Sequence, residues 1–346
     1  MKTNYEHLAR VQALSAHDTN VIRDGALHSQ LLERKKRLQT AVSDPAPAEY
    51  LVNLLHEVDA ALSRMNDGTY GICETCHDSI ENERLLVDPL IRNCIDHLSA
   101  AEQRALERDL DLAYQVQNGL LPKPDITIDD WNVAYHYEPA GPVSGDYCDL
   151  IIPENGTGSF YFLLGDVSGK GVAASILMAH LHAIFRSLVG LHLPVHELVE
   201  RANGIFCSGT LSTHFATLVC GRADKHGTFE ICNAGHPLPL LAHGGKVESI
   251  SAGGLPLGLS CEQKYSHAKG TLPSGASLVL YTDGLTESRN RSNEEYGVER
   301  FTGLLREQST LSPRELIGAS LQDLTSFRSG VQKVDDLTMM VIHRSR

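Results

Sequence analysis

The sequence lacks the features of membrane-spanning proteins, of secreted proteins and of proteins that bind nucleic acid nonspecifically. No uninterrupted apolar run approaches the roughly 20 residues of a membrane span, and the first seven residues are too polar for a signal peptide. Lys and Arg number 30 against 43 Asp and Glu, and the formal net charge of −13 argues against nonspecific binding to nucleic acid. We therefore expect a cytoplasmic protein with no membrane partner and no direct nucleic-acid contact.

Two common catalytic motifs are also missing. Only three residues separate Gly165 from Gly169, and Lys170 is followed by glycine, which argues against a nucleotide-binding P-loop. Ser168 is not embedded in G-x-S-x-G, which argues against a serine nucleophile elbow. In a reducing compartment, we expect the eight cysteines to be free thiols or metal ligands rather than disulfides.

The N-terminal third has the pattern of helices. At 346 residues and 42% apolar, the chain is long enough for two or more domains. Two apolar stripes flank a turn at Ser43 to Pro47 and predict a helical hairpin over residues 1–66. A charged helix with near-heptad apolar steps follows over residues 99–122 and ends at Pro122. Such a seam is more often intrachain packing, and homodimerisation through this linker helix is the alternative.

A metal-binding pattern lies between these helices, in residues 67–98. Cys73 and Cys76 are followed, after 17 intervening residues, by Cys94 and His97, which gives C-x2-C-x17-C-x2-H. Two short-spaced pairs on separate turns can supply the four ligands of a tetrahedral zinc ion. We predict a closed, structural Zn²⁺ site.

Carboxylates stand where apolar runs begin or end in the remaining chain. Asp166 and Asp283 each end such a run, Asp335 precedes one, and Asp146 follows a glycine. A single Asp at a strand end is more often a turn cap, but four of them are hard to explain as unrelated turns. Like charges gathered at one place repel unless cations neutralise them, so a cluster implies a hard divalent metal with oxygen ligands.

Residues 123–346 have the composition of one α+β domain. Short apolar segments between glycine-bounded turns predict strands, and few helices fall between successive strands, which favours two antiparallel sheets over a doubly wound parallel sheet. Strands are expected over 133–137, 159–164, 215–219, 228–232, 238–241, 278–281 and 337–342, and helices after residue 171 and over 194–206 and 312–327.

Two resemblances extend these predictions. Residues 67–76, together with Ile80, Arg84, Leu85, Pro89 and Cys94, resemble the DksA/TraR-type zinc finger, which implies a contact with bacterial RNA polymerase. His97 stands where that family usually has its last cysteine, and the hairpin tip lacks the family's paired acidic residues.

The second resemblance covers nearly all of residues 125–346. The motifs at 143–149, 165–171, 215–218, 233–237, 255–258, 281–287 and 335–338 resemble the stage II sporulation protein E-type branch of the metal-dependent protein phosphatases, relatives of protein phosphatase 2C. The resemblance implies an αββα sandwich, two Mn²⁺ or Mg²⁺ ions, and a protein substrate phosphorylated on serine or threonine.

The same resemblance implies roles for individual residues. The expected metal ligands are Asp146, Asp166, Asp283, Asp335 and the carbonyl of Val167, with Asp166 bridging the ions. Asp336 takes a supporting position beside them. Asp149, three residues from Asp146 on a strand, is expected to point to the other face.

The proton donor to the leaving group stays open. In eukaryotic relatives a histidine follows the bridging aspartate by two positions, and here that place is Ser168. His236, in a Gly-His-Pro turn, fits a structural role at least as well as that of a general acid.

Two functions from different classes fit this organisation. One is a metal-dependent protein serine/threonine phosphatase, controlled by its N-terminal module, that acts on a phosphorylated regulatory protein such as an anti-sigma-factor antagonist. In it, two ions activate water for phosphate ester hydrolysis. The alternative is a DksA-like transcription regulator that binds RNA polymerase and carries a subordinate or inactive phosphatase domain. The four aspartates and the missing acidic tip favour the first.

Overall fold

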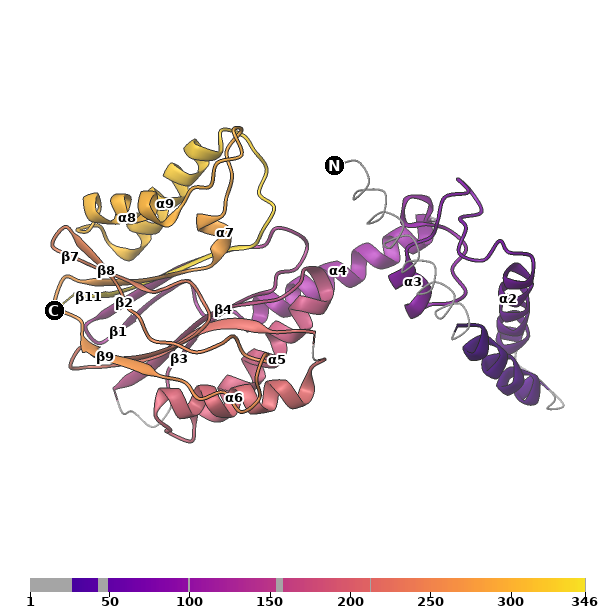
Figure 1. Ribbon diagram of the computed structural model, residues 1–346, viewed down its shortest axis with the longest axis horizontal. Helices are drawn as coiled ribbons and strands as arrows, with labels where there is room; N and C mark the ends of the chain where they lie inside the picture. Colours follow the sequence, from indigo (N-terminus) through magenta and orange to yellow (C-terminus); the bar gives the residue numbers. More distant parts are fainter. Residues whose placement is uncertain (1–26, 43–48, 99, 154–157, 212, 346) are drawn as a thin grey trace, which may run out of the picture. The chain divides into compact units, whose positions relative to one another are not determined.

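The computed structural model describes residues 27–42, 49–98, 100–153, 158–211 and 213–345 (Figure 1). The chain divides into two compact units, Met1–Glu107 and Arg108–Arg346. The beginning of the predicted hairpin and its tip at residues 43–48 lie outside the described residues.

The N-terminal unit contains the helical hairpin. Residues 27–42 are helical, and α2 (Glu49–Asn66) follows them. Leu31 and Leu38 pack against Val58 and Leu62, so the two apolar stripes meet as predicted.

A smaller segment follows the hairpin in the same unit. It holds α3 (Asn82–Val87) and the short 3₁₀-helix η1 (Ile95–His97). Its core is small, with Cys73, Ile80, Leu85 and Cys94 buried beside Leu27. Helix α4 (Ala100–Leu120) comes next, and two prolines, Pro122 and Pro124, follow its end.

The C-terminal unit is built on two antiparallel sheets. The six-stranded sheet has the order β1-β2-β11-β10-β7-β8, and the five-stranded sheet has the order β3-β4-β5-β6-β9. The strands are β1 (Asp125–Ile128), β2 (Trp131–Glu138), β3 (Asp146–Ile151), β4 (Ser159–Val167), β5 (Ala216–Asp224), β6 (Thr228–Ala234), β7 (Leu240–His243), β8 (Lys246–Ser249), β9 (His267–Thr271), β10 (Ser277–Tyr281) and β11 (Leu337–Arg344).

Helices cover the outer face of each sheet (Figure 1). Helices α5 (Gly171–Val189) and α6 (Val195–Gly209) pack on the five-stranded sheet. Helices α8 (Val298–Glu307) and α9 (Pro313–Arg328) pack on the six-stranded sheet, and the single-turn α7 (Asp283–Thr286) follows β10. The predicted αββα sandwich is confirmed.

The core between the two sheets is aromatic and aliphatic. Trp131, the only tryptophan of the chain, is 2% exposed and lies edge-on to Phe160, with Phe162 beside it. Among the described residues, only α5 has the length and apolar composition of a membrane span. Its Met178 and Phe185 are buried in the core that it forms with the sheet.

Some elements differ from the predicted ones. Strand β4 continues to Val167, so Asp166 is hydrogen-bonded within the sheet rather than standing just beyond its end. Strands β1, β8 and β9 and helix α8 were not predicted. Strands β8 and β9 are short edge strands that read Lys-Val-Glu-Ser and His-Ala-Lys-Gly-Thr and carry almost no apolar signal. Helix α9 begins as its sequence predicts, with Ser312 and Glu315 in a capping box and Pro313 in the first turn.

The expectation that all eight cysteines are free thiols or metal ligands is wrong for one pair. Cys207, in the last turn of α6, forms a disulfide with Cys261, with the Cα atoms 5.7 Å apart. The two cysteines are 54 positions apart in the sequence, so local spacing gave no sign of the pair.

Candidate active site

The predicted aspartates converge where strands of both sheets end. Asp146 opens β3 and faces Asp166 of β4 across the antiparallel ladder. In the other sheet, β10 and β11 are neighbours; Asp283 follows β10 and Asp335 precedes β11. The backbone N–H of Thr282 donates to the carbonyl of Thr338 at 2.9 Å and holds these two strand ends together.

Asp146 is fixed from the opposite sheet. It is 1% exposed, and its Oδ2 accepts hydrogen bonds from the hydroxyls of Thr282, at 3.1 Å, and of Thr338. The Thr282 hydroxyl in turn accepts from the Thr338 N–H at 2.9 Å. Both threonines bind the same carboxylate oxygen, so neither of them holds Oδ1.

The carboxylates raise one another's pKa. Burial, followed by the charges of Asp283, Asp335 and Asp336, raises the pKa of Asp166 to about 7. Burial and the charge of Asp166 raise the pKa of Asp146 well above its ordinary value. Burial and the charge of Asp335 raise the pKa of Asp283. The ionised cluster is therefore unfavourable by itself and favourable beside cations.

The space beside Asp166 fits a hard cation. A Cβ atom at Gly145 would lie 3.1 Å from the carbonyl oxygen of Val167 and 3.5 Å from Oδ1 of Asp166. The glycine thus keeps open a volume lined by a carboxylate and a carbonyl oxygen, which are ligands that Mg²⁺ and Mn²⁺ accept. Among the described residues, no three of the clustered aspartates have donor atoms that all lie within 4.8 Å of one another. A pair of ions about 4 Å apart needs such a wider set.

Asp336 holds the loop that leads into β3. Its Oδ1 accepts from the N–H of Ala140 at 2.6 Å and its Oδ2 from the N–H of Gly145 at 2.8 Å. The backbone of Asp336 passes close to Gly284, where only glycine fits, because a Cβ there would lie 1.8 Å from the carbonyl oxygen of Asp336. Both oxygens of Asp336 are therefore engaged by the backbone of this loop.

A lysine that the sequence did not single out as a site residue lies at the edge of the cluster. Lys170 Nζ donates to the carbonyl of Val334 at 2.7 Å and is 3.2 Å from Oδ1 of Asp335. Its side chain is 64% exposed, so its head group can move into the space above the carboxylates.

Helix α4 is hydrogen-bonded to Ser144, which lies two residues before Asp146. Gln117 Nε2 donates to the carbonyl of Ser144 at 2.7 Å, and the Ser144 N–H donates back to Gln117 Oε1 at 3.0 Å. The Ser144 hydroxyl accepts from the N–H of Asp146 at 3.0 Å. Gln117 is 4% exposed, so the pair is shielded from water. The sequence of α4 gives no sign of this role, because Gln103, Gln115 and Asn118 on the same helix are equally polar and only the structure shows that Gln117 is buried.

Asp149 lies on the other face of β3, as the strand periodicity predicts. It is fully buried and forms a bidentate ion pair with Arg186 of α5, at 3.0 Å to Nε and 2.7 Å to Nη2. The carboxylate is thereby used to fasten α5 to the five-stranded sheet.

His236 and Ser168 are engaged in structural contacts. The ring Nδ1 of His236 lies 2.8 Å from the Thr217 hydroxyl, and Thr217 faces Asp166 across the β4–β5 ladder. Burial lowers the pKa of His236 to about 3, so its imidazole is neutral at ordinary pH. The Ser168 hydroxyl accepts from the N–H of Phe215 at 3.0 Å. The Ser168 hydroxyl accepts in this contact and keeps its own proton, whereas the buried, neutral His236 is a poor general acid.

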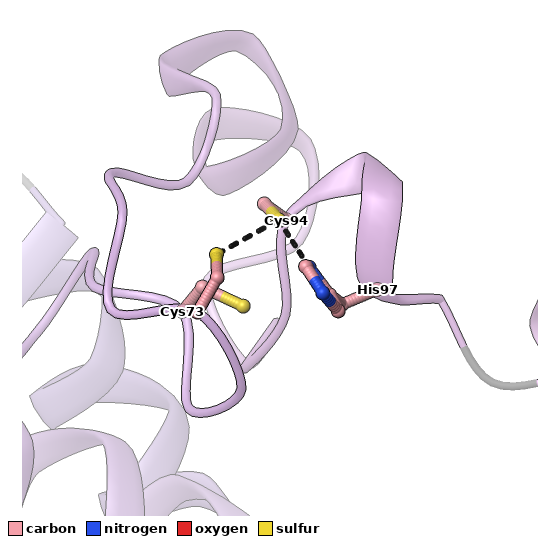
Figure 2. Close-up of side chains that lie close together, drawn as sticks. Cys73, Cys94 and His97 are labelled. Carbon is pink, nitrogen blue, oxygen red and sulfur yellow. Dashed lines mark hydrogen bonds between the residues drawn. The ribbon is translucent and has the colours of Figure 1, made fainter.

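The four predicted zinc ligands also lie together, in the N-terminal unit. Donor atoms of Cys73, Cys76, Cys94 and His97 all lie within 4.8 Å of one another. Figure 2 shows three of these side chains converging. Sγ of Cys94 is 3.7 Å from Sγ of Cys76 and 3.2 Å from Nδ1 of His97. Burial alone would raise the pKa of Cys73, but backbone N–H groups at Cys76, Cys94 and Thr75 lower it to about 6, which favours a thiolate.

The two antiparallel sheets with helices on both outer faces give the C-terminal unit the fold of the protein phosphatase 2C class. The SiaA-PP2C domain of Pseudomonas aeruginosa has the same fold, with a TM-score of 0.62 at 18% identity, covering 71% of this chain and 99% of that domain.

Sequence comparisons narrow the class to one family. The stage II sporulation protein E (SpoIIE) family model matches residues 156–345. Phosphoserine phosphatase RsbU of Bacillus subtilis is 26% identical over 249 residues, which are 70% of this chain and 72% of RsbU. Protein IcfG of Synechocystis is 25% identical over 267 residues, 68% of this chain but only 42% of IcfG, so the chain spans less than half of that relative. The chain belongs to the SpoIIE family.

Proposed function

We propose that this chain is a Mn²⁺- or Mg²⁺-dependent phosphoprotein phosphatase that hydrolyses phosphoserine or phosphothreonine on a regulatory protein. The observation that carries the proposal is the acidic cluster at which strand ends of both sheets meet, with pKa values raised by mutual repulsion. Membership of the SpoIIE family supports it, and so does the similarity to a relative named as a phosphoserine phosphatase.

Asp146, Asp166, Asp283 and Asp335 would hold two ions, with the carbonyl of Val167 as a further ligand and Asp166 between the ions. When bound, such ions lower the pKa of water and clamp phosphate oxygens, which is the chemistry that a phosphate monoester requires. An all-oxygen donor set selects Mg²⁺ or Mn²⁺ over softer metals.

Other side chains position this centre. Thr282 and Thr338 hold one oxygen of Asp146 and so set the direction of the other. Lys170 supplies a positive charge next to Asp335 at the mouth of the site, where a phosphate dianion would approach. Because His236 is buried and its pKa is lowered to about 3, it is a poor general acid, and we propose that the leaving serine alkoxide takes its proton from solvent.

The substrate that we propose is a phosphorylated regulator of the anti-sigma-factor antagonist type, as the family resemblance implies. Such signalling proteins are cytoplasmic, and we place this chain in the cytoplasm as well.

We further propose that Cys73, Cys76, Cys94 and His97 hold a structural Zn²⁺ in a DksA/TraR-type finger. Zn–S bonds of about 2.3 Å in a tetrahedron place two sulfurs roughly 3.8 Å apart, and the Cys76 and Cys94 sulfurs are 3.7 Å apart. The core around them is small, so the ion would supply much of this segment's stability. We do not propose an RNA polymerase contact, because the hairpin-tip sequence from Ser43 to Pro47 lacks the paired acidic residues of the DksA family.

Control by the N-terminal module would pass through α4. The reciprocal pair between Gln117 and Ser144 supports this, because a shift of the helix would move the loop before Asp146. Leu112 and Val116, one turn apart on α4, are 60% and 58% exposed, which supports homodimerisation through the same helix. Analytical ultracentrifugation tests the dimer: we expect the wild type to sediment as a dimer and Leu112→Glu/Val116→Glu as a monomer. An equal mass for both proteins would contradict dimerisation through this face.

The enzymatic proposal is tested by hydrolysis of a phosphoserine peptide and of p-nitrophenyl phosphate with Mn²⁺, Mg²⁺ or EDTA. We expect turnover with either metal, none in EDTA, and a loss of at least about 100-fold in Asp283→Asn, because removing a ligand charge weakens the ion and its activation of water. Asp323→Asn is a matched control, since Asp323 is paired with Arg300 on the outer helical layer. Turnover that persists in EDTA or in Asp283→Asn would refute the proposal.

A further inference from the structure

A second set of metal-ligating side chains lies at the far edge of the five-stranded sheet. His196 of α6, Glu230 of β6 and His267 of β9 each offer a donor atom, and all of these lie within 4.8 Å of one another. Strand β9 is the edge opposite β3, which carries Asp146, so this set is separate from the acidic cluster.

The sheet register brings these residues to one face. Glu230 lies opposite Lys269 and Cys232 opposite His267 in the β6–β9 ladder, so all four side chains point to the same side. Cys232 is buried against the α5 and α6 layer, which identifies that side as the face that α6 covers. His196, the second residue of α6, supplies the third donor from the helix that covers this face.

The polar atoms of the set are incompletely satisfied. Nδ1 of His196 is buried without a hydrogen-bond partner. Glu230 is 4% exposed, and its Oε1 makes no well-aligned hydrogen bond but pairs with the Lys269 ammonium at 3.1 Å. His267 Nε2 is 3.6 Å from Glu230 Oε1, which is too long for a hydrogen bond. It is close to the roughly 3.3 Å that separates two ligands of one tetrahedral ion with bonds of about 2.0 Å. The two imidazole rings stack with centroids 4.4 Å apart and planes 15° from parallel, so one ring must turn about its side-chain bonds before both nitrogens face a single ion.

Cations already neutralise Glu230 in part. Arg222 Nη2 is 3.2 Å from Oε2, and Lys269 Nζ is 3.1 Å from Oε1. The Lys269 side chain is 60% exposed and can withdraw into solvent, whereas Arg222 binds the other oxygen and can stay. The position of Lys269 is therefore the one that a divalent ion would take over.

We propose that His196, Glu230 and His267 form a binding site for a divalent transition-metal ion of the Zn²⁺ class. Two imidazoles and one carboxylate suit Zn²⁺ and Co²⁺ better than Mg²⁺, and three protein ligands leave a position open. His196 also lines an open cavity of about 610 Å³ together with Glu197, Glu200, Arg201 and Lys264, which gives an ion access from solvent. Such an ion would join the start of α6 to the edge strand β9 and its neighbour β6.

Zinc stoichiometry of the full-length protein, after equilibration with Zn²⁺ in excess Mg²⁺, tests the site. We expect His196→Ala/His267→Ala to bind one Zn²⁺ fewer than the wild type, and His243→Ala, with an exposed histidine on β7, to bind as many. The comparison rests on a difference, so the state of the cysteine site does not affect it. Equal stoichiometry in the wild type and the double variant would overturn the proposal.

Two further variants distinguish the loss of a metal ligand from a loss of folding. His267→Gln keeps the size and polarity of the side chain, and we expect at least roughly tenfold weaker Zn²⁺ binding with an unchanged unfolding midpoint in EDTA. Lys269→Met removes the competing cation, and we expect tighter Zn²⁺ binding than in the wild type. A purely structural ion-pair cluster would give the opposite result, with Lys269→Met less stable and its Zn²⁺ affinity unchanged.

Discussion

Replacing Asp166 by Asn is expected to stabilise the metal-free protein while removing its response to Mn²⁺. Asp166 is a partly buried carboxylate on β4 that faces the charges of Asp283, Asp335 and Asp336, and its pKa rises from 3.8 to about 7. The folded state therefore binds this proton more tightly than the unfolded state. For a carboxyl group with a raised pKa, stability is lost as the pH rises from about 4 to 7, and the loss is complete above that range.

The magnitude follows from the same values. A pKa raised from 3.8 to about 7 corresponds to roughly 4 kcal/mol of unfavourable free energy once the group is ionised in the folded protein. Relaxation of the site and entry of water reduce this, so we expect Asp166→Asn to gain about 2–4 kcal/mol at pH 8 in EDTA. At pH 5 most of the carboxyl is already protonated when folded, and the gain shrinks to about 1–2 kcal/mol.

Urea unfolding followed by tryptophan fluorescence measures this gain. Trp131 is the only tryptophan and lies in the core between the sheets, so its emission reports on the phosphatase domain alone. Saturating Mn²⁺ should raise the wild-type midpoint and leave that of Asp166→Asn nearly unchanged.

Asp149→Asn is the matched control, because Asp149 lies on the same sheet but is paired with Arg186. Asp149 is buried but the Arg186 side chain is 44% exposed, so losing the charge of Asp149 should destabilise the domain by about 1–3 kcal/mol and leave the midpoint's response to Mn²⁺ intact. If Asp166→Asn were less stable than the wild type in EDTA at pH 8, the electrostatic reasoning would be refuted.

Three further predictions concern the surroundings of the site. Gly145→Ala places a Cβ 3.1 Å from the carbonyl oxygen of Val167, so calorimetry should show weaker Mn²⁺ binding in a folded protein; unchanged affinity would contradict the assigned space. Gln117→Ala breaks the contact with Ser144 and should lower kcat severalfold, while the free energy of unfolding followed by Trp131 falls by no more than about 1–2 kcal/mol; an unchanged kcat would show that α4 does not influence the site. Cys94→Ser should bind one Zn²⁺ fewer than the wild type by metal analysis and increase amide exchange in the N-terminal unit, and an unchanged zinc stoichiometry would contradict the proposed ligand assignment.

The fold class was predictable because its signals are local. Alternation of short apolar runs with glycine-bounded turns gave the antiparallel sheets, and Ser312 with Glu315 marked the start of α9. The edge strand β9 escaped prediction because its residues are polar and its position depends on pairing with β6. Strand pairing between distant segments is a tertiary property that single-sequence patterns do not contain.

In the candidate site, too, the local features were predictable and the contacts between distant segments were not. Aspartates at strand ends were visible in the sequence, but the facing of Asp146 and Asp166 is a matter of register between two strands. The hydrogen bonds from Thr282 and Thr338 cross from one sheet to the other, and threonine is too common in strands to mark such a role. The partner of Asp149, Arg186, is 37 positions away and became evident only from the packing of α5.

The central claim is that carboxylates from both sheets form one centre for two ions. Electron paramagnetic resonance of the full-length protein titrated with Mn²⁺ tests it most directly, because two bridged Mn²⁺ ions couple magnetically and an isolated ion does not. We predict two coupled Mn²⁺ per chain in the wild type, loss of the coupled signal in Asp166→Asn, and hydrolysis that rises with the coupled species. A single uncoupled Mn²⁺, or activity that develops before any coupled pair appears, would contradict the two-ion account.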